Sequence, residues 1–417
     1  MSPWLSVVGI GEDGLAGLSP VARALVNHAT VLVGGKRHLA MLPPDDPREK
    51  LPWTAPFEAS IAEILKRQGQ PVCILASGDP LCYGVGVTLL RKLAIAEMTI
   101  IPAPSAFSLA CARLGWTFTE VETISLCGRN PTLLQGLLYP NARILVLSEG
   151  KHTPRVVAQL LADRGFGQSA LTVLEHLGGV KEHRLDGLAS DWSQEDFSLE
   201  IAALNVLAIA CPPVPLLLGG NNTAFSRLAG LPDSVYRHDG QLTKREVRAI
   251  TLAALAPAPG QLLWDIGAGC GSIAIEWMRS HSRCRAIAIE QHPERLGFIA
   301  QNASALGTPE LQIVSGKAPD ALQGLPAPDA IFIGGGVTSE GIVSTCWTAL
   351  KPGGKLVVNA VTLESEQVIL EGQQTLGGDL TRIAVQRAAP VGRFMGWKAM
   401  SPITQWTVIK GGMEHQI

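Results

Sequence analysis

The chain has 417 residues, which is too long for one ordinary hydrophobic core and predicts two or three domains. Apolar residues make up 47% of it and charged residues only 17%, a balance that excludes a disordered chain. Lys and Arg total 34 against 36 Asp and Glu, so the formal net charge is −2 and does not favour a nucleic-acid partner.

Signals for a membrane, for secretion and for a metal are all weak. The longest apolar candidate, Val206–Leu218, is shorter than the about 18 residues of a spanning helix and contains three prolines. The N-terminus lacks a basic region followed by a long apolar stretch, so we expect no signal peptide. The eight cysteines are at least nine positions apart, which supports neither a zinc site nor a disulfide framework. We therefore expect a cytoplasmic protein with reduced thiols, no membrane partner and no metal.

In the first half, short apolar runs alternate with segments of helical period, which is typical of an α/β fold with mainly parallel sheets. Ser19 followed by Pro20 predicts a helix start, with Ser as the N-cap and Pro at the first helical position. The strands predicted from apolar runs are Leu5–Ile10, Val31–Val33, Val72–Ala76, Met98–Ile101, Ile144–Leu147, Leu171–Leu174 and Val206–Ala210.

Three glycine-rich turns each follow a predicted strand of this half. They are Gly9-Ile-Gly11-Glu-Asp-Gly14, Ala76-Ser-Gly78-Asp79-Pro80 and Pro102-Ala-Pro-Ser105-Ala106. Each alone predicts only a tight turn or a capped helix start. Together they resemble the tetrapyrrole methylase family, the class III S-adenosylmethionine (SAM) enzymes of corrinoid and sirohaem synthesis.

Two later segments also look like this family, Ser125-Leu-Cys-Gly128-Arg129 and Val173-Leu-Glu175-His176-Leu-Gly178. In the family the first turn usually reads Gly-x-Gly-Pro-Gly, and here Glu12-Asp13 replaces the proline. The resemblance implies that SAM binds at residues of the three turns, namely Gly9, Gly11, Gly78, Asp79 and Ser105.

A break separates the halves. Cys211-Pro-Pro-Val-Pro215 cannot continue a helix or a central strand, and the following segment up to Gly240 has no hydrophobic period. We place the domain boundary near 211–220, with a connecting arm to about 240. The halves show no internal repeat and are expected to be different folds.

The second half restarts with Thr243-Lys-Arg-Glu246, a capping-box pattern that predicts a helix with Thr243 as its N-cap. Strands and helical segments then alternate in the order of a doubly wound, Rossmann-like sheet. The predicted strands are Leu262–Ile266, Ala286–Glu290, Leu311–Val314, Ala330–Ile333 and Leu356–Ala360.

The sharpest motif follows the first of these strands and reads Asp265-Ile-Gly267-Ala-Gly269-Cys-Gly271-Ser272. Its glycines let the backbone approach a ligand at a helix N-terminus, and Glu290, at the end of the next strand, can accept both hydroxyls of a ribose. The motif and this acid resemble class I SAM methyltransferases. That family implies a cofactor site made of Thr243, Asp265, Gly267, Ala268, Gly269, Cys270, Gly271, Glu290 and Ala318.

Two SAM folds of different classes on one chain is a rare combination. The junction from Gly230 to Arg248 resembles the fused precorrin-6Y C5,15-methyltransferase (decarboxylating) family of cobalamin synthesis. The resemblance implies a class III domain at 1–212 and a class I domain at 216–417. It also implies two SAM sites per chain, methylation of meso carbons 5 and 15 of precorrin-6Y, loss of the ring-C acetate as carbon dioxide to give precorrin-8x, and a homo-oligomer.

The tetrapyrrole substrate carries many carboxylates, so arginines near the two sites are candidate anchors. His238, Asp239 and Arg393 are the candidate substrate-binding residues, with Arg237 and Arg387 as further arginines. No catalytic residue is assigned. Two alternatives stay open: an RNA-modifying SAM methyltransferase with an appended binding module, and a SAM-sensing protein without catalysis.

Overall fold

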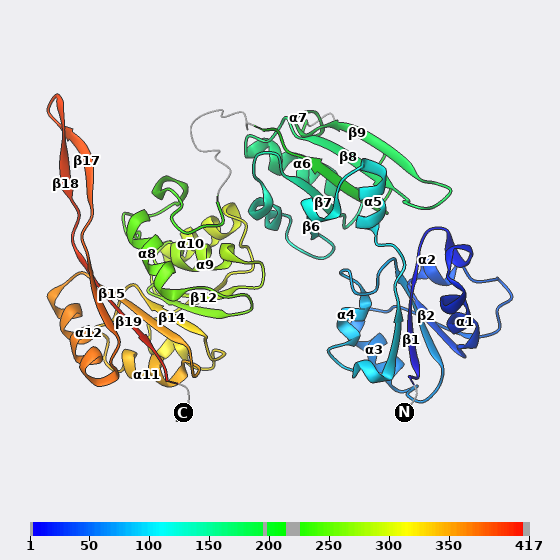
Figure 1. Cartoon of the computed structure of the whole chain (residues 1–417), viewed down its shortest axis with the longest axis horizontal. Helices are drawn as coiled ribbons and strands as arrows, with labels where there is room; N and C mark the ends of the chain where they lie inside the picture. The colour runs from blue at the N-terminus through cyan, green and yellow to red at the C-terminus, as the bar shows by residue number, and fades with distance from the viewer. Residues whose placement is uncertain (1–2, 195–197, 214–225, 412–417) are drawn as a thin grey trace. The chain divides into compact units, whose positions relative to one another are not determined.

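The computed structural model describes residues 3–194, 198–213 and 226–411 (Figure 1). The chain divides into a first unit, Met1–Pro131 with Pro140–Leu216, and a second unit, Thr132–Tyr139 with Leu217–Ile417. Most of the predicted boundary, at 214–220, lies outside the described residues. None of the helices in the described ranges combines the length and apolar character needed to cross a bilayer.

The first sheet of the first unit has the order β3-β2-β4-β1-β5, and all its neighbouring strands are parallel, as predicted. Alternate residues of β1 serve two cores, since Leu5 and Val7 pack on one face and Val8 and Ile10 on the other. Ser19 accepts a hydrogen bond from the N–H of Ala22 and caps α1, as predicted. The elements are β1 Leu5–Ile10, α1 Pro20–His28, β2 Val31–Gly34, α2 Lys36–Leu39, β3 Glu49–Pro52, α3 Phe57–Leu65, β4 Val72–Ser77, α4 Val85–Leu89 and β5 Met98–Ile101.

The second sheet of the first unit has the order β6-β7-β10-β8-β9, and among its pairs only β6 and β7 are parallel. The prediction of mainly parallel sheets is wrong here. An apolar run shows that a strand is buried on both faces, but it does not encode the direction of the strand. The elements are α5 Ala106–Leu114, β6 Glu122–Ser125, β7 Arg143–Leu147, α6 Thr153–Asp163, β8 Ala170–Glu175, β9 His183–Leu188, α7 Ala189–Trp192 and β10 Asn205–Ala210.

The second unit contains a seven-stranded sheet of order β13-β12-β11-β14-β15-β19-β16. Its first five strands are parallel and reverse their order after β11, which confirms the doubly wound prediction. Strand β19 is antiparallel to β15, and β16 is antiparallel to β19. The elements are α8 Arg245–Leu255, β11 Leu262–Ile266, α9 Ser272–Ser280, β12 Arg285–Glu290, α10 Pro293–Ala305, β13 Gln312–Ser315, β14 Ala330–Ile333, α11 Ile342–Ala349, β15 Lys355–Ala360, α12 Leu363–Leu376, β16 Asp379–Ile383, β17 Gln386–Val391, β18 Phe394–Ala399 and β19 Ile403–Ile409.

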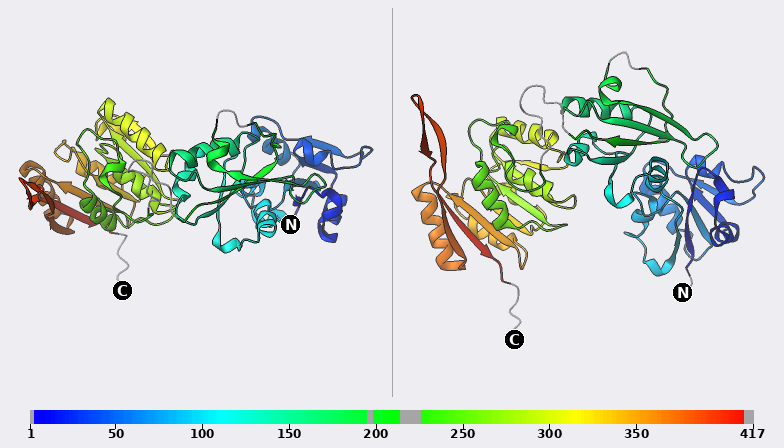
Figure 2. Two further views of the ribbon diagram at one scale, coloured as in Figure 1. Left: turned by 90° about the horizontal axis from the view of Figure 1, so that it is seen from above. Right: turned by 45° about the horizontal axis from the view of Figure 1, so that its top comes forward.

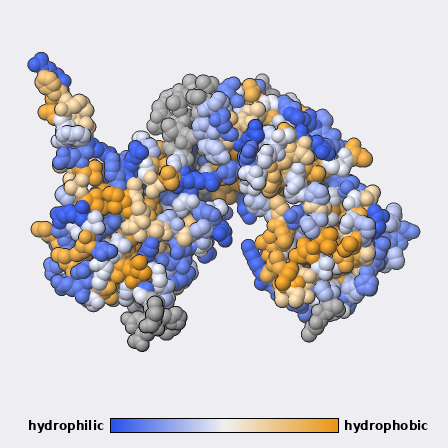
Figure 3. Space-filling view, in the orientation of Figure 1, coloured by the Kyte–Doolittle hydropathy of each residue, from blue (hydrophilic) through white to orange (hydrophobic). Residues whose placement is uncertain are grey.

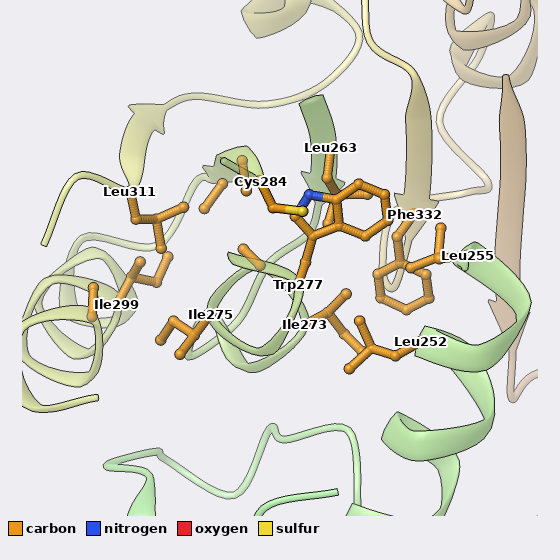
Figure 4. Packing of buried hydrophobic residues seen from close by; sticks show 14 of the residues in the cluster. Leu252, Leu255, Leu263, Ile273, Ile275, Trp277, Cys284, Ile299, Leu311 and Phe332 are labelled. Carbon is orange, nitrogen blue, oxygen red and sulfur yellow. The ribbon is translucent and has the colours of Figure 1, made fainter. Parts of the chain in front are cut away.

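Two cores hold this sheet between helices. On one face, Leu263 and Phe332 of the sheet pack against α8, α9 and α10, with Trp277 of α9 at the centre (Figure 4). The Trp277 ring is fully buried, and its indole N–H donates to the carbonyl of Arg285 over 3.0 Å. On the other face, Trp264 and Trp406 pack with α11 and α12. The glycine turn after β11 is therefore fixed from both sides.

The start of α8 differs from the prediction. The helix begins at Arg245, its N-cap is Lys244, and no side chain caps it, so Thr243 is not the N-cap. Glu246 pairs with Arg387 at 2.5 Å instead of closing a capping box. Thr243 lies one position before the N-cap, and its carbonyl accepts a hydrogen bond from the buried Arg248.

Strands β17 and β18 form a separate antiparallel hairpin that extends away from the sheet (Figure 1 and Figure 2). Apolar side chains lie on its surface (Figure 3). The four most exposed of them are Val391, Phe394, Met395 and Trp397. This hairpin was not predicted from the sequence.

Candidate functional site

A cavity of about 760 Å³ lies at the carboxyl ends of β11, β12, β13, β14 and β15 in the second unit. This is the edge at which doubly wound sheets bind their ligands. Most of the predicted cofactor residues line it, namely Thr243, Asp265, Gly267, Ala268, Gly269, Cys270, Glu290 and Ala318. Gly271 is the exception, because it is the left-handed N-cap of α9 and packs against Ile299 of α10.

The glycines of the β11–α9 turn have different structural roles. Gly267 has φ +67°, and a Cβ there would lie 2.7 Å from the carbonyl oxygen of Gly335, so the turn after β11 packs directly on the turn after β14. Gly269, at φ +60°, has more space, with only the carbonyl of Gln241 at 3.3 Å from a built Cβ. A ligand can therefore approach the backbone at Gly269.

Glu290 is buried at the end of β12, with 4% of its surface exposed. One carboxylate oxygen accepts the N–H of Gly269 at 2.8 Å, and the other accepts the N–H groups of Gln291 and His292 at 2.9 and 3.0 Å. The glycine turn and the acid are thus one hydrogen-bonded structure. A carboxylate has about four acceptor positions, so this one can still accept from a hydroxyl in the cavity.

Asp265 supplies an unsatisfied acceptor in the same cavity. Its Oδ2 accepts the N–H of Ala274 at 3.0 Å, while its buried Oδ1 has no hydrogen-bond partner among the described residues. Burial, and secondarily the charge of Glu290, raise the pKa of Asp265 to about 7. A ligand with a cationic or N–H donor would satisfy Oδ1 and favour the ionised carboxylate.

The cavity also contains cations that the sequence did not single out. Lys244, Arg295, Lys317 and Lys398 line it, so it can receive an anionic ligand as well as a cofactor. These residues come from four separate segments of the chain, and no motif connects them. The one signal in the sequence is local: Lys317 directly precedes Ala318, a predicted cofactor residue.

The predicted substrate-binding residues are not among those lining this cavity. His238 accepts the N–H of Gly240 through Nδ1 at 2.9 Å, which is a local turn bond. Asp239 pairs with Arg295 at 2.8 Å and thereby positions a lining cation. Arg393 lies at the tip of the β17–β18 hairpin, with its guanidinium 5.2 Å from the centre of the Phe394 ring.

The two other candidate arginines have protein partners. Arg237 donates to the Gln301 side chain at 2.9 Å. Arg387 pairs with Asp233 at 2.9 Å and with Glu246 at 2.5 Å, which ties the base of the hairpin to the connecting arm and α8. Its hydrogen bonds to these carboxylates, that to Glu246 first, raise the pKa of Arg387, so the charge is permanent.

A second cavity, of about 450 Å³, lies in the first unit. Both sheets of that unit contribute to it: the turns after β1, β2, β4 and β5 on one side, and the ends of β6, β7 and β8 on the other. Among the predicted cofactor residues, Gly11, Gly78, Asp79 and Ser105 line it.

Gly9 does not line this cavity, because it is packed inside the turn cluster. A Cβ on Gly9 would lie 1.9 Å from the carbonyl oxygen of Gly78 and 2.5 Å from the nitrogen of Ala103. Gly78 itself, at φ +55°, approaches the carbonyl of Pro104. The structure thus brings the three predicted turns together, and Gly9 has a packing role in that contact.

The two acidic residues that replace the usual proline point in different directions. Asp13 folds back on its own turn, where its carboxylate fills the space beside Gly17. Glu12 lines the cavity, pairs with Arg37 and accepts from Nδ1 of His176 at 2.8 Å. Arg37 also donates to Ser77 at 3.0 Å and contacts Nε2 of His38 at 2.9 Å. Burial, followed by the charge of Arg37, lowers the pKa of His38 to about 4, so His38 is neutral near pH 7.

Both cavities fit SAM in the chemistry of their residues. The cavity of the second unit has an unpaired acceptor at Asp265 for an amino group and a carboxylate at Glu290 for a ribose. The cavity of the first unit has the backbone of Gly11 and Gly78 and the carboxylate of Asp79. Within the described ranges, no three His, Cys, Asp or Glu side chains gather closely enough to hold a metal ion.

Comparison with known proteins gives two family matches. Residues 5–191 match the model described as tetrapyrrole (corrin/porphyrin) methylases, and residues 234–410 match a precorrin methyltransferase domain. A curated relative from Sinorhizobium, precorrin-6Y C(5,15)-methyltransferase [decarboxylating], is 48% identical over 412 residues, 99% of this chain and 97% of its own length. The crystal structure of the C-terminal domain of precorrin-6Y C5,15-methyltransferase from Rhodobacter capsulatus is 45% identical over 45% of this chain and all of its own, with a TM-score of 0.43.

Two shorter relatives each match about half of the chain. Cobalt-precorrin-7 C(5)-methyltransferase from Salmonella typhimurium is 30% identical over 200 residues, 48% of this chain and 98% of its own. Probable cobalt-precorrin-6B C(15)-methyltransferase (decarboxylating) from Pyrobaculum calidifontis is 33% identical over 180 residues, 42% of this chain and 92% of its own.

Proposed function

The chain belongs to the precorrin-6Y C(5,15)-methyltransferase (decarboxylating) family, and we propose that its two cavities are two separate SAM sites that serve two methyl transfers. The chain is a SAM-dependent C-methyltransferase (decarboxylating) of cobalamin biosynthesis. Family membership favours this function over an RNA-modifying enzyme or a SAM sensor. The observation that carries the two-site proposal is that each unit has its own strand-end cavity, lined by the glycine turns of its own family.

When bound, SAM supplies an activated methyl group, so the chain's own residues have to position the reactants and exclude water. In the second unit we assign the ribose to Glu290 and the amino group to Asp265, which both line the cavity. The backbone of Gly269 allows the close approach. In the first unit we assign the same task to Gly11, Gly78, Asp79 and Ser105.

The proposed substrate is the carboxylate-rich tetrapyrrole precorrin-6Y, and the proposed product is precorrin-8x. Lys244, Arg295, Lys317 and Lys398 would receive its carboxylates at the cavity of the second unit. These four cations replace His238, Asp239 and Arg393 as candidate substrate contacts in our proposal.

We also propose how the two activities divide. The half-length relatives carry the two methylations on separate chains, and the C(15) enzyme is the one named as decarboxylating. A cluster of lysine and arginine side chains suits the binding of an acetate group before its loss, so we assign C15 methylation and decarboxylation to the second unit. The first unit then methylates C5.

We further propose a homo-oligomer in the cytoplasm without a nucleic-acid partner. The exposed apolar face of the β17–β18 hairpin supports self-association. All eight cysteines are free, and six of them are buried, which suits a reducing compartment.

Mass spectrometry of the products formed by the intact chain from precorrin-6Y and SAM tests the proposal. We expect a product that has gained two methyl groups and lost one carbon dioxide. A wild-type chain that adds only one methyl group would contradict the two-site proposal.

A further inference from the structure

Glu12 and His176 come from sequence positions 164 residues apart and meet in the cavity of the first unit. The carboxylate of Glu12 accepts from Nδ1 of His176 at 2.8 Å. Because Nδ1 donates to this carboxylate, Nε2 is the nitrogen that carries the free lone pair. No described residue hydrogen-bonds to Nε2, and 26% of the His176 side chain is exposed.

The position of His176 is specified by the backbone. It follows β8 directly, and its φ is +46°, a conformation that non-glycine residues rarely adopt. Its N–H donates to the carbonyl of Leu204 at 3.2 Å. A strained backbone at the end of a strand, with its side chain turned into a cavity, is the arrangement that functional residues often show.

The charged groups in contact with each other beside the ring are Glu12 and Arg37. Arg37 pairs with the Glu12 carboxylate and so helps to fix its position against His176. When the ring does gain a proton, Glu12 stands in contact with it and stabilises the imidazolium. Glu12 thus both orients the ring and compensates its charge.

We propose that His176 is the base that removes the meso-carbon proton in the first unit, and that Glu12 is its positioning residue. The inference rests on the proposed function. Methylation replaces the hydrogen of a meso carbon by a methyl group, so one proton has to leave for each methyl group gained. The turns assigned to SAM, at Gly78 and Ser105, line the same cavity as His176, so donor and base face one substrate.

The π pair of the enamine-like carbon forms the new C–CH₃ bond, and the pair of the broken S–CH₃ bond stays on a neutral thioether sulfur. The carbon then carries both hydrogen and methyl, and the positive charge lies on the conjugated ring nitrogen. Nε2 of His176 takes the proton, the C–H pair restores the double bond, and the imidazolium later releases its proton to water.

The first test needs no substrate. ¹⁵N NMR of the intact, histidine-labelled chain without ligand should show His176 as a neutral ring protonated at Nδ1, assigned by the signal that disappears in His176→Gln. Glu12→Ala should shift this ring toward the other tautomer. A wild-type ring protonated at Nε2 would overturn the proposal.

The second test is a single-turnover measurement on the intact chain. We expect His176→Gln to slow formation of the doubly methylated product about 10²–10⁴-fold, the usual contribution of a general base. SAM affinity at the cavity of the first unit should stay within threefold of wild type. Added imidazole should restore activity to His176→Gly.

His183→Gln is the matched control, because His183 also pairs with a glutamate, Glu175 at 3.3 Å, but does not line the cavity. Its product should form at the wild-type rate. A His176→Gln chain as fast as wild type, or one whose loss comes from SAM affinity and is not rescued by imidazole, would overturn the inference. A wild-type chain that never adds two methyl groups would instead contradict the proposed function.

Discussion

Glu290 is the residue whose assignment in the second unit can be tested most simply. It is a buried, charged acceptor that lines the cavity and also fixes the glycine turn through Gly269. Glu290→Ala should remove about 1.5–3 kcal/mol of interaction with SAM, which is roughly a tenfold to hundredfold loss of affinity. Calorimetry measures this loss.

The control for this variant is Glu294→Ala, since Glu294 is exposed in the first turn of α10 and does not line the cavity. SAM affinity should not change in the control. If Glu290→Ala binds SAM at two sites with wild-type affinity, Glu290 does not hold the ribose.

The raised pKa of Asp265 predicts that the free energy of unfolding of the chain depends on pH. The pKa of its carboxyl is about 7 in the folded chain, against 3.8 when exposed. Between these pH values the unfolded chain has lost the proton that the folded chain keeps, so stability falls as pH rises from about 4 to 7. Above pH 7 this cost is complete and on the order of 4 kcal/mol.

Asp265→Asn should therefore be more stable than wild type at pH 8. The gain should be about 1–3 kcal/mol, because the amide leaves an unsatisfied polar group of its own. The difference should vanish near pH 4. Thermal unfolding of the ligand-free chains at several pH values measures it. If Asp265→Asn instead loses stability relative to wild type as pH rises from 4 to 8, then the Asp265 carboxylate is ionised and fully hydrogen-bonded in the folded chain.

At the scale of elements, a buried ion pair attaches the connecting arm to α8 and α9. Glu276 of α9 accepts from Arg248 of α8 at 2.6 Å, from the hydroxyl of Tyr236 at 2.9 Å and from the N–H groups of Gly230 and Leu231. Arg248 is completely buried and Glu276 nearly so.

Glu276→Ala should destabilise the second unit by about 3–5 kcal/mol, because it leaves the Arg248 charge buried without its partner. Denaturant unfolding followed by tryptophan fluorescence measures the change, since Trp277 is the next residue along α9. Glu310→Ala, at an exposed position before β13, should stay within about 0.5 kcal/mol of wild type. Equal stability of the two variants would contradict the role of the pair.

The β17–β18 hairpin is the element that supports self-association. Phe394 and Trp397 are 68% and 75% exposed, which is unusual for aromatic side chains of a chain without a partner. The wild-type chain should elute as an oligomer in size exclusion with light scattering, and Phe394→Ser with Trp397→Ser should shift it toward the monomer. A monomeric wild type would contradict the proposal.

The sequence predicted elements well where burial is strong on both faces, as in β1, β4, β11 and β14. It missed β3, β6 and β9, whose strands lie at sheet edges and alternate weakly, so they give no apolar run. It also missed β16, β17 and β18, because β17 and β18 are mostly exposed and β16 is buried only at Ile383. Strand β19 is buried, but its buried positions include the polar Thr404 and Gln405, so it gives no apolar run.

The same contrast holds for the site residues: those marked by a local motif were predicted, and those brought together only by folding were not. Asp265, Gly269 and Glu290 were predicted because each lies within a few residues of a strand end that a motif marks. The contact of Glu12 with His176 could not be predicted, since only the folded chain brings together residues so distant in sequence. The lining cations Lys244 and Lys398 belong to separate segments for the same reason.

For the whole molecule, the central claim is that one chain holds two SAM sites, one in each unit. Gly335 offers a clean way to close one of them. It lines the cavity of the second unit, has no left-handed φ, and a Cβ built on it meets no atom nearer than 4.0 Å. A valine there should project into the cavity, at the turn after β14, without straining the turn. Gly297→Val on the exposed face of α10 is the matched control, because nothing lies within 4 Å of its built Cβ.

The most direct measurement is therefore the number of SAM molecules bound per chain, determined by calorimetry. We predict two for wild type and for Gly297→Val, and one for Gly335→Val, which should also form no doubly methylated product. One site in the wild-type chain, or two sites in Gly335→Val, would contradict the account.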